Sequence, residues 1–247
     1  MKLELNKNIV YLDEIESTNS YAIELIKDDS CRNAFVISAD FQSAGKGQRL
    51  SSWISDKYKN ILLSIVIKSP VNISYPFYLT ALSSLCLIDL LEYIGIDDIS
   101  IKWPNDILVD NKKIAGILIE NKMRSNKILN TVIGIGLNVN QSKFPNFDRE
   151  ATSIINEKFI YSDIDHVLHK LLFFFERRYS HNILSQEKNV ICEYINHLYL
   201  RDTTSLFEIN GREMSAKIMS VTGDGRLIVD IDNEIHKLLL GQVKFLS

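Results

Sequence analysis

Cysteine is scarce in this sequence, and its few residues are not placed as a cross-linked framework would need. Only three occur among 247 residues, at Cys31, Cys86 and Cys192, and no two of them form a Cys-x-x-Cys pair. An odd number of distant cysteines argues against a disulfide scaffold and indicates reduced thiols. His166 and His169 lie one helical turn apart without an accompanying Glu-x-x-His motif. We therefore predict no metal site made by protein side chains.

Long apolar runs and an excess of positive charge are missing as well. No stretch approaches the roughly 20 apolar residues of a membrane-spanning helix, and residues 1–10 alternate instead of forming a signal-peptide core. The net charge is −3, whereas binding to a nucleic-acid backbone normally needs a basic face. With 46% hydrophobic residues, the chain has material for one large and one small domain. These features predict a cytoplasmic protein that binds neither membrane nor DNA.

One rigid, lysine-containing segment stands out among the motifs that are present. It reads Lys102-Trp-Pro-Asn-Asp106 and follows a short extended stretch. Pro104 fixes its own φ angle and biases the residue before it toward extended geometry. Lys102 and the Asn105–Asp106 pair are therefore held on a turn, where a fixed ammonium group suits an anionic ligand. Taken alone, the segment also fits a surface lysine beside a packed tryptophan.

A glycine loop, residues 42–53, supplies a second possible anion site. It follows a strand-like segment and reads Gln-Ser-Ala-Gly-Lys-Gly-Gln-Arg-Leu-Ser-Ser-Trp. Gly45 and Gly47 allow main-chain N–H groups to approach a ligand closely, while Lys46 and Arg49 add positive charge. The loop lacks the Gly-Lys-Ser/Thr ending of a Walker loop, and solvated basic loops share its composition. Its last residue, Trp53, suits either stacking on a planar base or packing in the core.

A third candidate lies at the start of the first expected helix. Ser17 or Thr18 would cap this helix, which we expect to run to about Asp28, with Asn19 in its first turn. The unpaired amides and the positive dipole end favour an anionic or polar group. The alternative is capping alone.

The remaining elements follow from the apolar periodicity. We expect strands over residues 35–41, 60–67, 107–109, 114–119 and 128–139, and helices over residues 77–93, ended by Gly95, and 162–179, with a capping box at Ser162. Residues 110–113 would join two strands as a hairpin. This predicts an α+β fold with a mixed, mainly antiparallel sheet covered by helices. After about residue 198, short strands separated by turns predict a small β-barrel.

Two glycines, Gly134 and Gly136, interrupt the last strand of the predicted sheet. Glycine inside a strand often marks the close approach of a ligand or of another backbone, although a bulge or tight sheet packing has the same signature. The pair does not fit a dinucleotide fingerprint, because no helix opens after it.

Four motifs thus occur in one order along about half of the chain: Ser17-Thr-Asn19, the glycine loop, Lys102-Trp-Pro-Asn-Asp106 and Ile133-Gly-Ile-Gly-Leu-Asn138. Together they resemble the biotin protein ligases, and the tail is similar to that family's small C-terminal barrel. The resemblance implies a class II synthetase-like catalytic domain over residues 1–197 and an SH3-like barrel over residues 198–247. Because only sixteen residues precede Ser17, we expect the single-function type without a DNA-binding domain.

The resemblance also implies a reaction and its participants. Biotin and ATP, with Mg²⁺ on the ATP phosphates, would form biotinyl-adenylate and pyrophosphate. A lysine of a biotin carboxyl carrier protein, such as the acetyl-CoA carboxylase subunit, would then take the biotinyl group. The ligase would be a monomer or a homodimer.

The same resemblance assigns site residues, with Lys102 as the catalytic cation. For biotin it implies Ser17, Thr18, Asn19, Gln42, Lys46, Gly47, Gln48, Lys102, Gly134 and Gly136. For ATP it implies Gly45, Lys46, Gln48, Arg49, Trp53, Asn105 and Asn138. The loop departs from the family pattern at Lys46, Gln48 and Leu50–Ser51, where Arg or Gly is common. Because ammonium cannot reproduce bidentate guanidinium contacts, we expect a looser hold on the adenylate.

Two alternatives stay open. A lipoate or octanoate ligase of the same superfamily would share the single key lysine, although the Arg-Arg-x-x-Gly-Gly-Gly segment typical of those enzymes is absent. A non-catalytic biotin-sensing module would share the binding residues but not the turnover.

Overall fold

The computed structural model describes residues 3–27, 33–68, 77–124, 127–182 and 187–246. Its strands are β1 (Ile9–Leu12), β2 (Ala34–Ala39), β3 (Ile61–Lys68), β4 (Ile99–Lys102), β5 (Asp106–Val109), β6 (Lys112–Arg124), β7 (Lys127–Leu137), β8 (Thr204–Ile209), β9 (Arg212–Val221), β10 (Leu227–Ile231), β11 (Glu234–Leu238) and β12 (Val243–Phe245). Its helices are η1 (Leu5–Lys7), α1 (Thr18–Leu25), η2 (Gln48–Leu50), α2 (Tyr78–Ile94), α3 (Ile154–Lys158), α4 (Ile164–Asn182) and α5 (Glu187–Asn196), where η marks a 3-10 helix.

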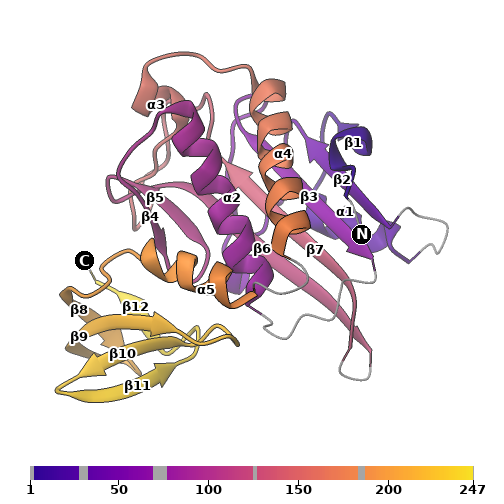
Figure 1. The fold of residues 1–247 in the computed structure, drawn as a ribbon. Coiled ribbons are helices and arrows are strands. Elements are labelled where there is room, and N and C mark those ends of the chain that lie inside the picture. Colours follow the sequence, from indigo (N-terminus) through magenta and orange to yellow (C-terminus); the bar gives the residue numbers. More distant parts are fainter. Residues whose placement is uncertain (1–2, 28–32, 69–76, 125–126, 183–186, 247) are drawn as a thin grey trace.

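Seven strands form one large sheet in the order β1-β2-β3-β7-β6-β5-β4 (Figure 1). Only β1 and β2 pair in parallel, and every other neighbouring pair in this sheet is antiparallel. The predicted α+β fold with a mixed, mainly antiparallel sheet is confirmed.

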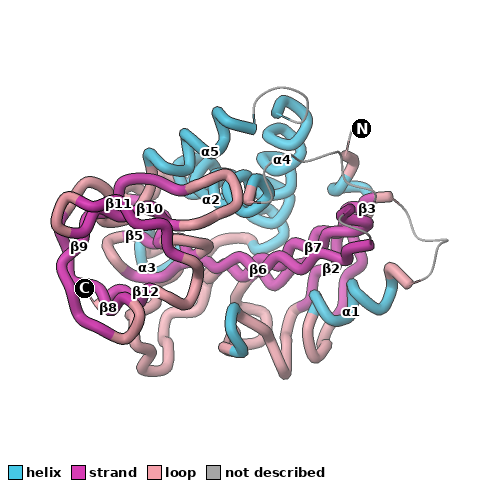
Figure 2. The backbone as a smooth tube through the Cα atoms, turned by 90° about the horizontal axis from the view of Figure 1, so that it is seen from below, coloured by secondary structure: helices cyan, strands magenta, loops and turns pink. Residues whose placement is uncertain are grey.

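Helices cover one face of this sheet, and α1 lies on the other. Figure 2 shows α2, α4 and α5 above the strands and α1 below them. The first seven residues of β3 are buried, because this central strand is covered on both faces. Its sequence, Ile-Leu-Leu-Ser-Ile-Val-Ile, is apolar except for Ser64, which is 0% exposed.

Helix α2 is the apolar centre of the helical layer and ends where the sequence indicates. Gly95 caps it in the left-handed conformation, with φ of 82°, which glycine adopts without steric cost. Cys86 lies buried in this helix as a free thiol, and burial raises its pKa. Cys192 is free and exposed on α5, and Cys31 lies outside the described residues.

Two expected helix boundaries differ in detail from the structure. Helix α1 is capped by Ser17 and ends at Leu25, whereas the expected end at Asp28 lies outside the described residues. Helix α4 begins one residue later than its predicted capping box, because the carboxylate of Asp163 accepts the N–H of His166 at 3.2 Å. Ser162 instead pairs through its backbone with Asn140.

The hairpin between β5 and β6 is tighter than predicted. Its connection is not residues 110–113 but Asp110 and Asn111, which have φ of 44° and 65°, the positive values that a two-residue type I′ turn requires. Lys112 and Lys113 therefore belong to strand β6 and not to the loop.

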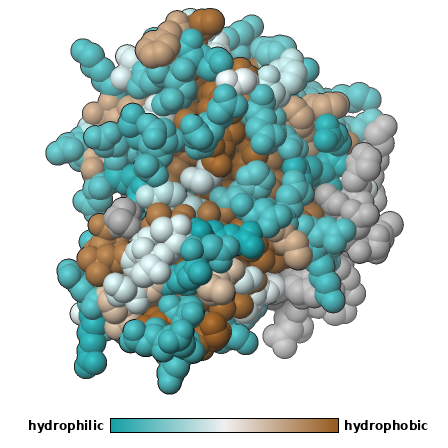
Figure 3. Space-filling model, turned by 60° about the vertical axis from the view of Figure 1, so that its left-hand side comes forward, coloured by the Kyte–Doolittle hydropathy of each residue, from teal (hydrophilic) through white to brown (hydrophobic). Residues whose placement is uncertain are grey.

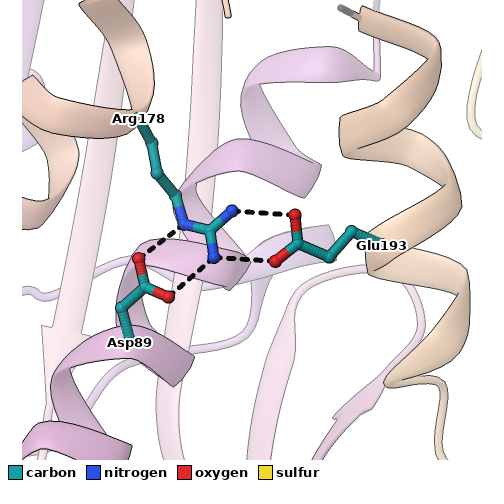
Figure 4. A network of polar contacts seen from close by, with 3 residues as sticks. All are labelled: Asp89, Arg178 and Glu193. Atoms are coloured by element: carbon teal, nitrogen blue, oxygen red, sulfur yellow. Dashed lines mark hydrogen bonds and ion pairs between the residues drawn. The ribbon is translucent and has the colours of Figure 1, made fainter. Parts of the chain in front are cut away.

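A partly buried ionic network ties the helical layer together. The guanidinium of Arg178 on α4 contacts Asp89 on α2 through Nε and Nη2, each at 2.6 Å (Figure 4). It also donates to Glu193 on α5 through Nη1 at 3.0 Å and Nη2 at 2.8 Å. These hydrogen bonds lower the pKa of the Glu193 carboxyl. One guanidinium group thus fixes the relative positions of three helices.

The C-terminal strands form a separate antiparallel sheet in the order β11-β10-β9-β8-β12, as expected for a small SH3-like unit. The predicted boundary between residues 197 and 198 falls between α5 and β8, and it stays a prediction. Most of the surface seen in Figure 3 is hydrophilic, with hydrophobic groups in smaller patches. Among the described residues no helix is both long enough and apolar enough to cross a bilayer.

Candidate active site

A cavity of about 540 Å³ opens between the α1 face of the large sheet, the glycine loop and the C-terminal sheet. Thirteen of the fifteen predicted site residues line it: Ser17, Thr18, Asn19, Gln42, Lys46, Gly47, Gln48, Arg49, Trp53, Lys102, Asn105, Gly134 and Gly136. Four motifs that are far apart in the sequence therefore meet in one place.

Gly45 and Asn138 do not line the cavity, although both were expected to contact the nucleotide. Asn138 is 4% exposed, and its Nδ2 donates to the carbonyl of Thr152 at 2.9 Å. The carbonyl of Gly45 accepts the N–H of Trp53 at 2.9 Å, and a Cβ here would lie 2.5 Å from the Trp53 carbonyl oxygen. Both residues lie outside the cavity lining, and their assignment to the nucleotide stays a prediction.

Four side chains, Ser17, Thr18, Asn19 and Gln42, form what we call the amide side of the cavity. Oε1 of Gln42 accepts both the backbone N–H of Thr18 at 2.7 Å and its hydroxyl at 3.0 Å. Because Oε1 faces these donors, Nε2 must point the other way. Within the described residues, Nε2 has no hydrogen-bond acceptor.

Asn19 is held more completely. Its Nδ2 donates to Oε2 of Glu120 at 2.8 Å and to the carbonyl of Leu118 at 3.3 Å. Its Oδ1 accepts the hydroxyl of Ser64 at 2.6 Å, and the same hydroxyl lies 2.8 Å from Oγ1 of Thr18. Ser64 and Glu120 were not predicted, because a serine in an apolar strand and a glutamate on another strand carry no distinctive pattern.

The strand register explains the two glycines of β7. Gly134 pairs with Ser64 and with Leu118, and a Cβ on it would lie 2.4 Å from Oδ1 of Asn19. Gly136 pairs with Gly116, and a Cβ on it would lie 2.4 Å from the indole of Trp53. The close approach expected at Gly134 and Gly136 is therefore made by the side chains of Asn19 and Trp53. These two side chains lie over adjacent rows of the sheet.

We call Arg49, Trp53, Lys102 and Lys113 the cationic side of the cavity. Lys113, which was not predicted, forms an ion pair with Asp106 at 2.7 Å, and its Nζ lies 5.5 Å from the Trp53 ring centroid. Nε1 of Trp53 is buried without a hydrogen-bond partner among the described residues. An unsatisfied buried donor carries an energetic cost that an acceptor group of a ligand would remove.

A β-bulge directs Lys113 into the site. Ile107 pairs with Ala115 but Leu108 pairs with Lys113, so β6 carries one extra residue, Ile114. A bulge changes the facing of the side chains beside it, and bulges are common next to functional sites. Strict alternation of apolar and polar residues gives no signal for such an insertion, so the sequence pattern places this lysine in the turn instead.

Lys102 ends strand β4, as predicted, and its environment is partly desolvated. Its Nζ lies 5.3 Å from the ring centroid of Phe245 in the C-terminal sheet. Burial lowers the pKa of the Lys102 ammonium, although the nearby charge of Asp106 acts in the opposite direction. A charged group that has lost part of its hydration interacts strongly with an anion brought beside it.

The turn after Lys102 is fixed from two sides. Nε1 of Trp103 donates to the carbonyl of Gly225 at 3.0 Å, and the hydroxyl of Tyr194 donates to the carbonyl of Pro104 at 2.9 Å. Burial raises the pKa of the Tyr194 phenol well above its usual value, so this hydroxyl stays protonated. Lys102 therefore sits on a rigid support, as the sequence predicts.

The glycine loop is closed by its own hydrogen bonds. The N–H of Gly47 donates to the carbonyl of Ser51, and the hydroxyl of Ser51 donates to the carbonyl of Gln48, both at 2.7 Å. Ser51, a departure from the family pattern, thus stabilises the turn. The loop also touches the C-terminal sheet, since a Cβ on Gly241 would lie 1.9 Å from the guanidinium of Arg49.

The C-terminal unit supplies one wall of the cavity, chiefly through residues 240–246. Asp148 and Arg149 add a further charged pair to the lining. The C-terminal wall was not predicted, because short strands and a tail have little sequence signature, and Asp148 and Arg149 lie in an irregular segment between β7 and α3 that carries no motif.

Comparison with known proteins identifies the family. Residues 11–138, half of the chain, match the model of the biotin/lipoate A/B protein ligase family. The chain belongs to this family. Members that it resembles include the bifunctional ligase/repressor BirA of Bacillus spizizenii, 32% identical over 178 residues, which are 71% of this chain and 54% of that protein.

Two further members of the biotin/lipoate ligase family are similar. The biotin–[acetyl-CoA-carboxylase] ligase of Mycobacterium tuberculosis is 28% identical over 66% of this chain and 60% of its own length. The chain thus spans little more than half the length of these curated relatives. The solved structure of the Aquifex aeolicus biotin protein ligase in complex with biotin and ATP matches with a TM-score of 0.80 and 22% identity, over 96% of this chain and 98% of that one. This likeness confirms the fold.

Proposed function

We propose that this protein is an ATP-dependent ligase that activates biotin as biotinyl-adenylate and transfers it to a lysine of a biotin carboxyl carrier protein. The observation that carries the proposal is the meeting of the glycine loop, two lysines and the amide side in one cavity. The names of the relatives support it, since one is a biotin–[acetyl-CoA-carboxylase] ligase and a matching structure holds biotin and ATP.

The amide side matches the ring system of biotin in its hydrogen-bonding groups. The cyclic urea of biotin offers one carbonyl acceptor flanked by two N–H donors. Nε2 of Gln42 donates to no group among the residues that the structure describes, and Oδ1 of Asn19 keeps one lone pair for an additional donor. A lipoyl ring, which lacks these groups, would leave both side chains unsatisfied at a cost in binding.

The cationic side suits the first chemical step. A carboxylate oxygen of biotin attacks the α-phosphorus of ATP, an acid anhydride forms, and pyrophosphate leaves. Two anions must approach each other, and the ammonium groups of Lys102 and Lys113 would offset their repulsion and the charge of the transition state. Neither lysine acts as a nucleophile in this scheme.

The nucleotide would lie beside Trp53 and Arg49. The indole offers a face for stacking and an unmet N–H, while the guanidinium suits a phosphate. Magnesium would enter with ATP and neutralise part of the phosphate charge. The acidic residues in the cavity lining are Asp106, Asp148 and Glu208, and of these Asp106 already pairs with Lys113.

In the second step the ε-amine of the carrier lysine attacks the biotinyl carbonyl, an amide forms, AMP leaves and the amine loses a proton. The carrier lysine must reach the cavity, and residues 240–246 form part of its wall. Leu239 and Leu240 are 54% and 42% exposed at this place and offer apolar contact to a folded partner.

Isotope exchange tests the proposed function directly. We expect labelled pyrophosphate to enter ATP only when biotin is present, and we expect a purified carrier domain to gain one biotinyl group. Exchange supported by lipoate or octanoate but not by biotin would indicate the other branch of the family. Biotin binding without exchange would indicate a sensing module.

A further inference from the structure

The orientation of the Asn19 amide is imposed from outside the cavity. Nδ2 faces two groups that only accept hydrogen bonds, the Glu120 carboxylate and the Leu118 carbonyl. A reversed amide would place Oδ1 against both acceptors and lose both bonds. Glu120 therefore determines that Oδ1 of Asn19, and not its NH₂ group, remains available to a ligand in the cavity.

Glu120 itself does not line the cavity. It lies on β6, two residues beyond Leu118 and therefore on the same face of the sheet, and its pairing partner on β7 is Val132. Any influence on a ligand must pass through Asn19. Since a hydrogen bond to a charged acceptor is stronger than one between neutral groups, the carboxylate holds the amide more firmly than the carbonyl does.

Ser64 fixes the opposite edge of the same amide. Its hydroxyl donates to Oδ1 of Asn19 at 2.6 Å and is 0% exposed, in a strand that is otherwise apolar. A carbonyl-type oxygen has two lone pairs, so one acceptor position of Oδ1 remains. Gly134 provides the space, because any Cβ there would collide with this oxygen.

We propose that Glu120 is a positioning residue that presents Asn19 to the ligand as a hydrogen-bond acceptor and thereby selects a ring carrying N–H donors. This inference rests on the proposed function, since the cyclic urea of biotin is the ring in question. It adds a residue that the motif comparison did not assign.

Calorimetric titration of the full-length protein with biotin tests the role of Glu120. Removing the carboxylate in Glu120→Ala leaves the amide free to reverse, and we expect the Kd for biotin to rise about tenfold. Glu120→Gln, which retains an acceptor oxygen, should recover most of this loss. Glu24→Ala is the matched control, because Glu24 lies on α1 and pairs with Lys27 without touching Asn19.

A reversal of donor and acceptor gives a second test. In Asn19→Asp the new carboxylate faces Glu120, so like charges meet and we expect biotin binding to fall more than tenfold. In the double variant Asn19→Asp/Glu120→Gln, the glutamine NH₂ donates to the aspartate, which still presents an oxygen to the ligand. Its affinity should exceed that of the Asn19→Asp variant, a rescue that general destabilisation cannot produce.

The outcomes separate the two proposals. If the wild-type protein does not bind biotin, the proposed function fails and the inference fails with it. If the wild type binds biotin while Glu120→Ala binds it equally well, only the inference is overturned. The inference would also be overturned if Glu120→Ala weakened biotin binding, raised the KM for ATP and lowered the melting temperature together. Such a general loss would show a merely structural role.

Discussion

The amide side and the cationic side of the cavity hold their functional groups in different ways. At the amide side, the Asn19 and Gln42 side chains are held by hydrogen bonds with backbone and side-chain groups of other residues. At the cationic side, Lys102 and Lys113 rest against aromatic rings, and Arg49 reaches across to Gly241. The first arrangement suits a neutral ring of fixed shape, whereas the second suits phosphates whose charge changes during the reaction.

The largest expected effect falls on the cationic side. In Lys102→Ala we expect biotin-dependent pyrophosphate exchange to drop by about a hundredfold or more, because a fixed charge beside the reacting anions is lost. Lys113→Ala should have an effect of similar size. Calorimetry with biotin alone should show a much smaller change in Kd.

Lys112→Ala is the control for both lysine variants. Lys112 neighbours Lys113 in β6, but it pairs with Asp110 at 4.0 Å and does not line the cavity. Unimpaired exchange in Lys102→Ala, with the fold intact by circular dichroism, would refute the role given to that lysine.

The two glycines of β7 test whether the amide side and the cationic side bind different substrates. Gly134→Ala places a methyl group against Asn19 and should raise the KM for biotin about tenfold, while Gly136→Ala places one against Trp53 and should raise the KM for ATP by a similar factor. Steady-state exchange kinetics with each substrate varied in turn measure both constants. If both variants affected the two constants equally, the amide and cationic sides would not be separate binding regions.

The smallest effect is the pH dependence of the cationic side. Lys102 is charged below its pKa, which burial lowers, so exchange should decline as alkaline pH passes through that value. In Lys102→Arg the decline should move to higher pH, because guanidinium stays protonated there. A pH–rate profile of kcat/KM for both proteins measures the shift, and an unchanged alkaline limb in the arginine variant would exclude Lys102 as its source.

Much of the site was predictable because its residues lie in local motifs. Ser17-Thr-Asn19 begins a helix, Lys102 ends a strand, and Gly95 ends α2, all as local backbone rules indicate. The gathering of these motifs in one cavity followed from the family resemblance and not from periodicity.

The unpredicted residues share a physical reason. Lys113 enters the site through a bulge, Ser64 lies within a buried apolar strand, and Glu120 acts on Asn19 across the sheet. Each role depends on the register between strands, which distant parts of the chain set. Asn138 belongs to a sequence motif, but its Nδ2 donates to the carbonyl of Thr152, and its assignment to the nucleotide stays a prediction.

The wall contributed by residues 240–246 has a consequence for biosynthesis. Lys102 and the glycine loop leave the ribosome long before this wall exists, and Trp103 gains its partner only when Gly225 has been made. A nascent chain therefore carries the reactive groups without the enclosure that brings them together. Under the proposed function, adenylation should therefore begin only after β12 (Val243–Phe245) has docked.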